Sequence, residues 1–393
     1  DTHGVLEADV SVNSLTATQP WRIKFDWSKN PDNSTFLANT GGALDKVRSD
    51  SETITVVDNL DNEVTIPKKI DRIVVAGIFP FPSVLSIFLG SAEKIVGIPP
   101  VSMSAAKSGL LGEIFPEILK AETEYTNGDD LNIEELMKLN PDVVFYSSGN
   151  TEWTKMLKNA GIPGVAISPR KWGYDVLKTY DQWIALLSEI FPESDKAEQV
   201  SAYSKKVYET VQKKVAAVKP ADKKKVLFLF QYDDQKMITS GKHFFGQFWC
   251  DAVGALNAAE EITVDNANAK ITMEQVYKWN PDVVIITNFT PTEPQDLFNN
   301  RIAGDNWSSV KAVQDKAVYK MPLGSYRSYT PCADTPLTLL WLAKKVYPQL
   351  FTDVNVEKEV RDYYGKIYGI TLTDAQIKRM FTPGAEAAAG FKK

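Results

Sequence analysis

The stretch that decides the fold is ESDKAEQVSAYSKKVYETVQKKVAAVK, residues 193–219, which contains neither Gly nor Pro and lies between Pro192 and Pro220. Its apolar residues recur at spacings of three and four, which predicts one long amphipathic helix. Ser194 is the expected N-cap, and lysines gather at the other end, where the helix dipole favours positive charge. Such a helix would be roughly 37 Å long. We expect it to join two domains rigidly; the alternative is a surface helix within one domain.

The composition limits the class of protein. A chain of 393 residues with 44% hydrophobic content can build two cores. Its net charge of -6 argues against a nucleic-acid partner. Two histidines offer neither a poly-His metal site nor His-based acid–base chemistry. The two cysteines, Cys250 and Cys332, permit one disulfide at most.

The regions on either side of this helix have different patterns. Residues 1–51 are polar and irregular, and we expect a loosely attached extension that Trp21 and Trp27 anchor in part. Residues 53–67 alternate apolar and polar side chains about a polar turn, which predicts a β-hairpin. From residue 72 onward, short apolar strands alternate with helices, which predicts α/β domains. The predicted parts are an N-terminal extension (1–51), an N-terminal lobe (52–192), the connecting helix (193–219), a C-terminal lobe with closing helices (220–382) and a frayed tail (383–393).

An internal near-repeat supports two related domains. NIEELMKLNPDVVF, residues 132–145, aligns without gaps to TMEQVYKWNPDVVI, residues 272–285, with seven identities in fourteen positions. In each copy a helix ends at Asn, Pro prevents its continuation, and Val-Val begins a buried strand. The two copies lie on opposite sides of the connecting helix. Chance similarity between two helix-turn-strand units is the alternative.

Taken together, these features resemble the class III substrate-binding proteins of ABC importers, the family that receives iron-siderophores, haem and cobalamin. The resemblance covers roughly residues 53–376, and it also includes ITSGKHFFGQFWCDAVGALNAAEE, TPLTLLWLAKKVYPQLF and EVRDYYGKIYGITLTDAQ. It implies an α/β fold with two Rossmann-like lobes, one long rigid helix joining them, and a ligand cleft between the lobes, at the loops that follow the strands. It also implies a monomer that works with an ABC permease and its ATPase, in the periplasm or lipid-anchored outside the cytoplasmic membrane.

In the N-terminal lobe, the candidate ligand residues lie in loops after predicted strands. They are Phe79, Phe81, Asn150, Trp153, Arg170, Trp172 and Tyr174. A cationic group among aromatic side chains suits an anionic or chelated aromatic ligand, through charge-assisted hydrogen bonds and stacking. The alternatives are phenylalanines packed under the next helix and a solvated turn around the arginine.

In the C-terminal lobe, the candidates are Tyr232, His243, Asn288, Tyr326, Arg327 and Tyr329. Residues 324–336 are the strongest prediction, because the matching loop of the family contributes to ligand binding and an arginine among tyrosines fits a negatively charged complex. The alternative is a structural loop with the arginine in an intradomain salt bridge. The resemblance also implies that an acidic residue on each lobe docks on the permease, and by position these would be Glu113 or Glu117 and Glu260 or Glu261.

The sequence therefore predicts a binding protein and not an enzyme. Its ligand would be a metal chelate, namely a ferric siderophore, haem or cobalamin, so that any iron or cobalt would belong to the ligand, and the protein would have no cofactor or metal site of its own. An oxyanion such as molybdate or tungstate, held by backbone N–H groups, Ser, Tyr and one Arg, is the alternative within this fold. A two-lobed α/β enzyme is the second alternative, and the absence of G-x-G-x-x-G, Walker and G-x-S-x-G signatures argues against it.

Overall fold

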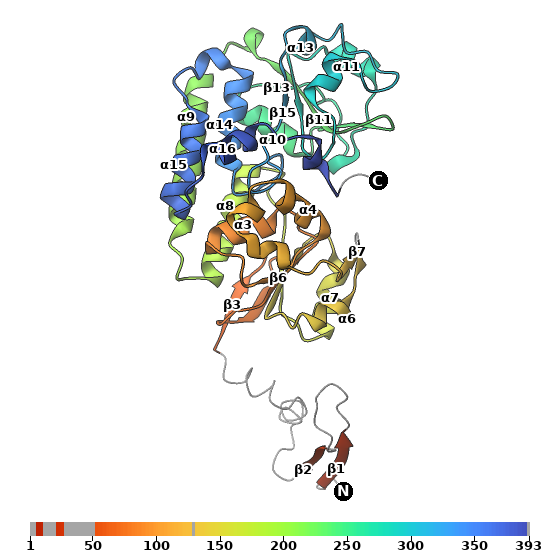
Figure 1. Ribbon diagram of the computed structural model, residues 1–393, viewed down its shortest axis with the longest axis vertical. Coiled ribbons are helices and arrows are strands. Elements are labelled where there is room, and N and C mark those ends of the chain that lie inside the picture. Colours follow the sequence, from red (N-terminus) through yellow and green to blue (C-terminus); the bar gives the residue numbers. More distant parts are fainter. Residues whose placement is uncertain (1–4, 11–20, 27–51, 128–129, 391–393) are drawn as a thin grey trace. The chain divides into compact units, whose positions relative to one another are not determined.

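The computed structural model describes residues 5–10, 21–26, 52–127 and 130–390. The chain divides into two compact units, residues 1–54 with 67–69 and residues 55–66 with 70–393. In the first unit, β1 (Val5–Val10) and β2 (Trp21–Asp26) pair in antiparallel fashion (Figure 1). The expectation that residues 1–51 are irregular was therefore wrong for these segments. WRIKFD alternates apolar and charged residues, which is the period of a strand; Trp27 lies outside the described residues.

The N-terminal lobe is built on a four-stranded parallel sheet. Its strand order is β10 (Gly164–Ile167), β9 (Val143–Ser147), β5 (Ile73–Ala76) and β6 (Ile95–Gly97). Helices cover both faces, which is why these strands are continuous apolar runs. On one face Val144 packs in a cluster with Leu136 and Leu157, whereas on the other Phe145 meets Phe81, with ring centroids 5.1 Å apart.

Smaller elements complete this lobe. The predicted hairpin is confirmed as β3 (Thr53–Val57) and β4 (Glu63–Pro67), and a second short pair joins β7 (Thr126–Asn127) to β8 (Asp130–Leu131). The helices are α3 (Phe81–Leu89), α4 (Pro100–Ser108), α5 (Leu111–Ile114), α6 (Ile133–Lys138), α7 (Thr151–Asn159) and α8 (Val176–Ile190). Gly90 ends α3 in the left-handed conformation, which glycine adopts without steric cost.

The C-terminal lobe has a second sheet with a parallel core. Its strand order is β12 (Met237–Thr239), β11 (Lys225–Tyr232), β14 (Val283–Ile286) and β15 (Val318–Lys320), with β13 (Leu256–Asn257) also paired to β11. The edge strand β12 runs antiparallel to β11. The helices around the sheet are α10 (Phe245–Ala252), α11 (Met273–Trp279), α12 (Pro294–Phe298), α13 (Lys311–Gln314) and α14 (Thr335–Val346).

The internal repeat has the same structural role in both lobes. Asn140 and Asn280 both adopt left-handed backbone conformations, with φ of 44° and 42°, and the proline that follows each one prevents further helix. The next residue then ties the new strand to the first strand of its sheet. Asp142 accepts from the backbone N–H of Arg72 at 2.9 Å, and Asp282 accepts from that of Lys225 at 2.9 Å. The repeat therefore marks equivalent positions in two similarly built lobes.

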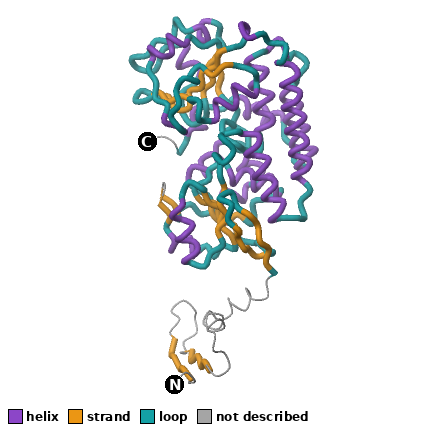
Figure 2. Tube along the Cα trace, turned by 180° about the vertical axis from the view of Figure 1, so that it is seen from behind, coloured by secondary structure: helices purple, strands orange, loops and turns teal. Residues whose placement is uncertain are grey.

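The connecting helix is α9 (Lys196–Val215), 20 residues long, so it is shorter than residues 193–219 and about 30 Å in length. It does not work alone. Figure 1 shows α9, α14 and α15 (Val356–Tyr368) side by side at one edge, and α8 packs against α9 and α14; in Figure 2, helices line the opposite side of the view, which is turned by 180°. The Tyr203 hydroxyl of α9 donates to Glu359 at 3.0 Å, and Tyr180 of α8 bonds to Tyr368 at 2.6 Å. α15, which lies within the predicted closing helices, therefore contacts both α8 and α9.

The C-terminal segment after α16 (Asp374–Phe381) differs from the expectation of a frayed tail. Residues Ala385–Ala388 form a 3-10 turn, and Ala387 and Ala388 are completely buried. This segment packs through small side chains and backbone carbonyl groups, and not through large apolar side chains.

Cys250 and Cys332 are both free and buried, so they form no disulfide. Within the described residues, no helix combines the length and apolar character that crossing a membrane requires.

Candidate ligand site between the lobes

Arg170 lies where two strands of the N-terminal lobe end. It follows β10, and its guanidinium extends over the loop after β9, where Nη2 is 3.3 Å from the position that a Cβ on Gly149 would occupy. Neighbouring parallel strands end at the same edge of a sheet, which brings these loops together. The Arg170 side chain remains 47% exposed. Asn150, at the start of α7, and Trp172 are half-buried on the same two loops.

Arg170 also faces the C-terminal lobe. Its Nη1 is 4.0 Å from Oδ2 of Asp265, a carboxylate that is 64% exposed. The Tyr174 hydroxyl donates to the other oxygen of Asp265 at 3.3 Å. Burial, together with the charge of Asp265, raises the pKa of Tyr174 to about 12, so this phenol remains protonated at neutral pH. His243 is exposed. It lies next to Asp265, because the backbones of these two residues pair.

Tyr174 has a strained backbone for a bulky residue, with φ of 62°. Such strain costs about 1–3 kcal/mol and persists only where surrounding contacts enforce it. Here the enforcing contacts come from the other lobe, since the Tyr174 ring lies edge-on to Phe244 at 5.7 Å and to Phe245 at 5.1 Å. Phe79 is half-buried against the same aromatic cluster. The loops of both lobes therefore meet through Tyr174, Phe244 and Phe245, which we call the cross-lobe cluster, next to the Arg170–Asp265 pair.

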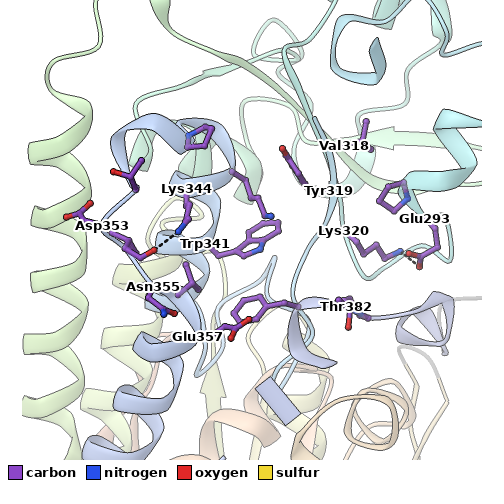
Figure 3. Close-up of a pocket in the computed structure, with 18 residues that line it drawn as sticks. Glu293, Val318, Tyr319, Lys320, Trp341, Lys344, Asp353, Asn355, Glu357 and Thr382 are labelled. Atoms are coloured by element: carbon purple, nitrogen blue, oxygen red, sulfur yellow. Dashed lines mark hydrogen bonds and ion pairs between the residues drawn. The ribbon is translucent and has the colours of Figure 1, made fainter. Parts of the chain in front are cut away.

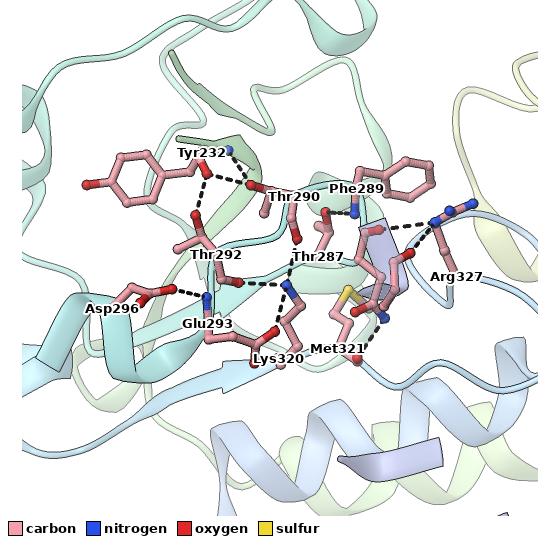
Figure 4. A network of polar contacts seen from close by, with 12 residues as sticks. Tyr232, Thr287, Phe289, Thr290, Thr292, Glu293, Asp296, Lys320, Met321 and Arg327 are labelled. Atoms are coloured by element: carbon pink, nitrogen blue, oxygen red, sulfur yellow. Dashed lines mark hydrogen bonds and ion pairs between the residues drawn. The ribbon is translucent and has the colours of Figure 1, made fainter. Parts of the chain in front are cut away.

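Arg327, the strongest sequence-based candidate, is completely buried. Its Nε donates to the backbone oxygens of Asn288 at 3.1 Å and Ala387 at 2.9 Å (Figure 4). Its Nη2 donates to Ala389 O at 2.7 Å, and Nη1 donates to Val101 O of the other lobe at 3.3 Å. The partners include carbonyl groups from both lobes and from the C-terminal segment. This differs from the open, ligand-facing guanidinium that the sequence predicted.

Several other candidates lie in structural positions. Phe81 packs in the N-terminal core, with its ring centroid 5.5 Å from that of Trp183. It is the first residue of α3 and not part of the preceding loop. Trp153 is buried against the loop at Gly77, where its ring would be 2.9 Å from an added Cβ. Both side chains therefore lie within the N-terminal lobe and outside the cross-lobe cluster.

The same holds for part of the C-terminal set. The hydroxyl of Tyr232 donates to Asp305 at 2.7 Å and accepts from the indole of Trp307 at 2.8 Å, inside a core of its own lobe. The Asn288 amide donates to Met321 O at 2.8 Å. Tyr329 and Tyr326 are buried beneath Arg327, and the Tyr329 hydroxyl accepts from the Gly246 N–H at 3.1 Å. All four of these side chains are buried.

Three of the four predicted docking glutamates have partners within the chain. Glu113 pairs with Arg379 of α16, Glu117 accepts from the backbone N–H of Ala92 at 3.1 Å, and Glu261 accepts from the indole of Trp279 at 2.9 Å. Glu260 is exposed, and we find no hydrogen bond or ion pair for its side chain in the described part of the chain. It is therefore the glutamate whose geometry leaves it available to another protein.

A separate hollow lies within the C-terminal lobe. It has a volume of about 980 Å³ and includes Trp341, Tyr319 and Lys320 among its lining residues (Figure 3). The Lys320 ammonium donates to Thr290 O at 2.7 Å and Thr292 O at 2.6 Å, and burial lowers its pKa to about 8. None of the sequence-based candidates lines this hollow. Across the described residues, no group of three or more His, Cys, Asp or Glu side chains is arranged to hold a metal ion.

Comparison with known proteins places this geometry in context. A family model described as periplasmic binding protein matches residues 75–323. The molybdate-binding protein MolA of Haemophilus influenzae is 28% identical over 332 residues, which are 80% of this chain and 90% of MolA. A periplasmic solute binding protein of Veillonella parvula is 29% identical, with a TM-score of 0.75 over 87% of this chain and all of that one. CeuE of Helicobacter pylori, solved with Ni-His, is 25% identical, with a TM-score of 0.66 over 84% of this chain and 99% of that one.

Proposed function

We propose, from the premise that this chain belongs to the class III periplasmic binding proteins that serve ABC importers, that it captures a small oxyanion of the molybdate class between its lobes. The protein would then deliver the anion to an ABC permease outside the cytoplasmic membrane. This reverses the order of the two ligand classes that the sequence suggested. The function is binding and release, and no chemical step is required.

The observation that carries the proposal is Arg170. Its guanidinium is half exposed at the edge of the N-terminal sheet, and its partner Asp265 is 4.0 Å away, which is a weak ion pair in water. An oxyanion can replace that carboxylate and form shorter, charge-assisted hydrogen bonds with the guanidinium fork. The side-chain amide of Asn150, on the neighbouring loop, is a hydrogen-bond donor of the kind that an oxyanion needs.

Two further observations favour the oxyanion over a free metal ion. The described residues contain no metal-ligating cluster, and the whole chain has two histidines. In addition, the relative MolA, at 28% identity over most of both chains, is a molybdate-binding protein. Molybdate requires hydrogen-bond donors and positive charge, which Arg170 supplies.

A metal chelate remains the second candidate, and a specific feature favours it. Trp172 and Phe79 are only half-buried, and Phe79 packs against the core that includes Tyr174 and Phe244; partly exposed aromatic rings can stack on planar chelates. A chelate would carry its own iron or cobalt, so the protein would again supply no metal ligand.

Isothermal titration calorimetry with molybdate, tungstate and sulfate tests the proposal. Arg170→Ala should weaken molybdate binding by about ten- to a hundredfold, because charge-assisted hydrogen bonds contribute about 1.5–3 kcal/mol each. Arg301→Ala is the matched control, since Arg301 is 62% exposed in an ion pair with Asp296 within the C-terminal lobe. Equal affinity in wild type and Arg170→Ala would refute the assigned site. Absence of oxyanion binding, with a visible absorption band in protein purified from iron-rich cultures, would favour the chelate.

A further inference from the structure

Residues 382–390, the C-terminal strap, follow α16 and lie against both lobes. On the N-terminal lobe, the Ser108 hydroxyl donates to the backbone oxygen of Glu386 at 3.2 Å. Gly390 lies so close to α4 that an added Cβ would be 3.0 Å from the Ser104 hydroxyl. On the C-terminal lobe, the strap is held by Arg327. The strap thus crosses from one lobe to the other next to the loop that the sequence singled out for ligand binding.

The strap occupies hydrogen-bond donors of Arg327 that are suited to an anion. Nε donates to Ala387 O at 2.9 Å and Nη2 to Ala389 O at 2.7 Å, and these two N–H groups lie on the same edge of the guanidinium. That edge is the one that pairs with two oxygens of a carboxylate or an oxyanion. In this chain it is paired with two neutral carbonyl oxygens of the strap, and Nε is shared with a third, that of Asn288. The strap therefore presents to Arg327 the acceptor pattern that a bound anion would present.

The strap is also built to be displaced at low cost. Its buried side chains are those of Pro383, Ala387 and Ala388, which are small and bury less apolar area than leucine or phenylalanine would. A guanidinium is attracted to an anion by opposite charge as well as by hydrogen bonds, and neutral carbonyl oxygens do not supply that full charge. An oxyanion would therefore gain from replacing the two carbonyl groups, and little apolar contact would oppose the exchange.

We infer that the C-terminal strap is an autoinhibitory cover, which shields Arg327 in the free protein and which an oxyanion displaces to obtain this second arginine. The inference rests on the proposed function, because the competing ligand is the proposed oxyanion. It adds a regulatory element: affinity is set by competition between the ligand and the chain's own carbonyl groups, and not by the exposed arginine alone.

A labelling experiment tests the cover without any ligand. The full chain and a variant that ends at Thr382 are treated with phenylglyoxal, which modifies accessible arginines, and the labelled sites are mapped by mass spectrometry. Arg327 should be unlabelled in the full chain and labelled in the truncated one, whereas the exposed Arg301 should be labelled in both. In case truncation impairs folding, Gly390→Val is the second variant. Its Cβ would crowd the Ser104 hydroxyl, and the backbone φ of 89° is unfavourable for valine. Failure of both variants to increase Arg327 labelling overturns the cover.

Titration with molybdate tests the competition. The truncated chain should bind molybdate at least tenfold more tightly than the full chain, and Glu386→Gln, which keeps the strap backbone, should bind like the full chain. In the full chain, molybdate should increase hydrogen exchange at the amides of residues 385–390. Equal or weaker binding after truncation overturns the inference while the proposed function stands. If neither form binds molybdate, the proposed ligand is wrong, and the labelling result alone then supports or overturns the cover.

Discussion

Tyr364→Phe should destabilise the protein through a single buried carboxylate. Asp334 is completely buried. Its Oδ2 accepts from the backbone N–H and the hydroxyl of Ser325, both at 2.8 Å, and its Oδ1 accepts from the hydroxyl of Tyr364 on α15. Removing that hydroxyl withdraws a donor from a buried charge. Hydrogen bonds to charged groups contribute about 1.5–3 kcal/mol, and an unsatisfied buried oxygen adds a desolvation cost, so we expect a loss of about 2–3 kcal/mol.

The pH dependence makes this prediction specific. Burial raises the pKa of Asp334, while the Tyr364 and Ser325 hydroxyls oppose that rise. A carboxyl whose folded pKa lies above its unfolded value favours folding most in acid, and that contribution is lost as the pH rises through the folded pKa. Without the Tyr364 hydroxyl the folded pKa rises further, so the difference between variant and wild type should grow from acid to alkaline pH.

Urea unfolding followed by circular dichroism, at about pH 5 and pH 8, measures both quantities. Tyr277→Phe is the matched control, because the exposed Tyr277 hydroxyl donates to a neutral backbone oxygen, that of Asn306, at 2.6 Å. This control should lose no more than about 1 kcal/mol, with no trend in pH. A loss below about 1 kcal/mol for Tyr364→Phe at both pH values would refute the support of Asp334 by the Tyr364 hydroxyl of α15.

Three other outcomes follow from the geometry. Burial raises the pKa of Asp181 to about 7 from 3.8, so its contribution to stability is present at about pH 4 and is lost as the pH rises through 7; Asp181→Asn should therefore add about 1–3 kcal/mol at pH 8 and little at pH 4 in thermal unfolding, whereas the exposed Asp222→Asn should change neither. Glu260→Ala should reduce uptake in cells that carry the permease and leave molybdate affinity unchanged, and equal uptake would exclude it as a docking contact. Small-angle scattering with and without molybdate should show that the radius of gyration decreases by less than about 1 Å on binding. A decrease of several ångströms would contradict a restrained hinge.

The order of strands and helices could be predicted because its signals are local. RIVVAG, DVVFYS and DVVIITN became β5, β9 and β14, since a parallel strand buried on both faces must be a continuous apolar run. The repeat NPDVV predicted two related lobes because Asn, Pro and Asp each determine one step of the turn between helix and strand.

The site was predicted less completely, because it depends on contacts between distant segments. Nothing near Arg327 in the sequence reveals that its guanidinium bonds to Val101 O, 226 residues away, or to Ala389 O, 62 residues away. Asp265 was missed because it lies in a polar loop that follows no predicted strand. Phe81 and Tyr232 were predicted to line the cleft. Aromatic residues next to strand ends can face a cleft or pack in a core, and only the packing distinguishes the two.

The connection between the lobes is broader than the single helix that the sequence emphasised, and this bears on how a ligand can move them. Besides α9, the Leu110 N–H donates to Gly324 O at 2.8 Å, and Glu113 of α5 pairs with Arg379 of α16. A large opening rotation would break both contacts and would withdraw Val101 from Arg327. A change confined to the strap breaks none of these contacts. If the free protein must admit a ligand, displacement of the strap is therefore the less costly route, and the resistance of the helical connection to rotation is the reason why a local cover can regulate the site.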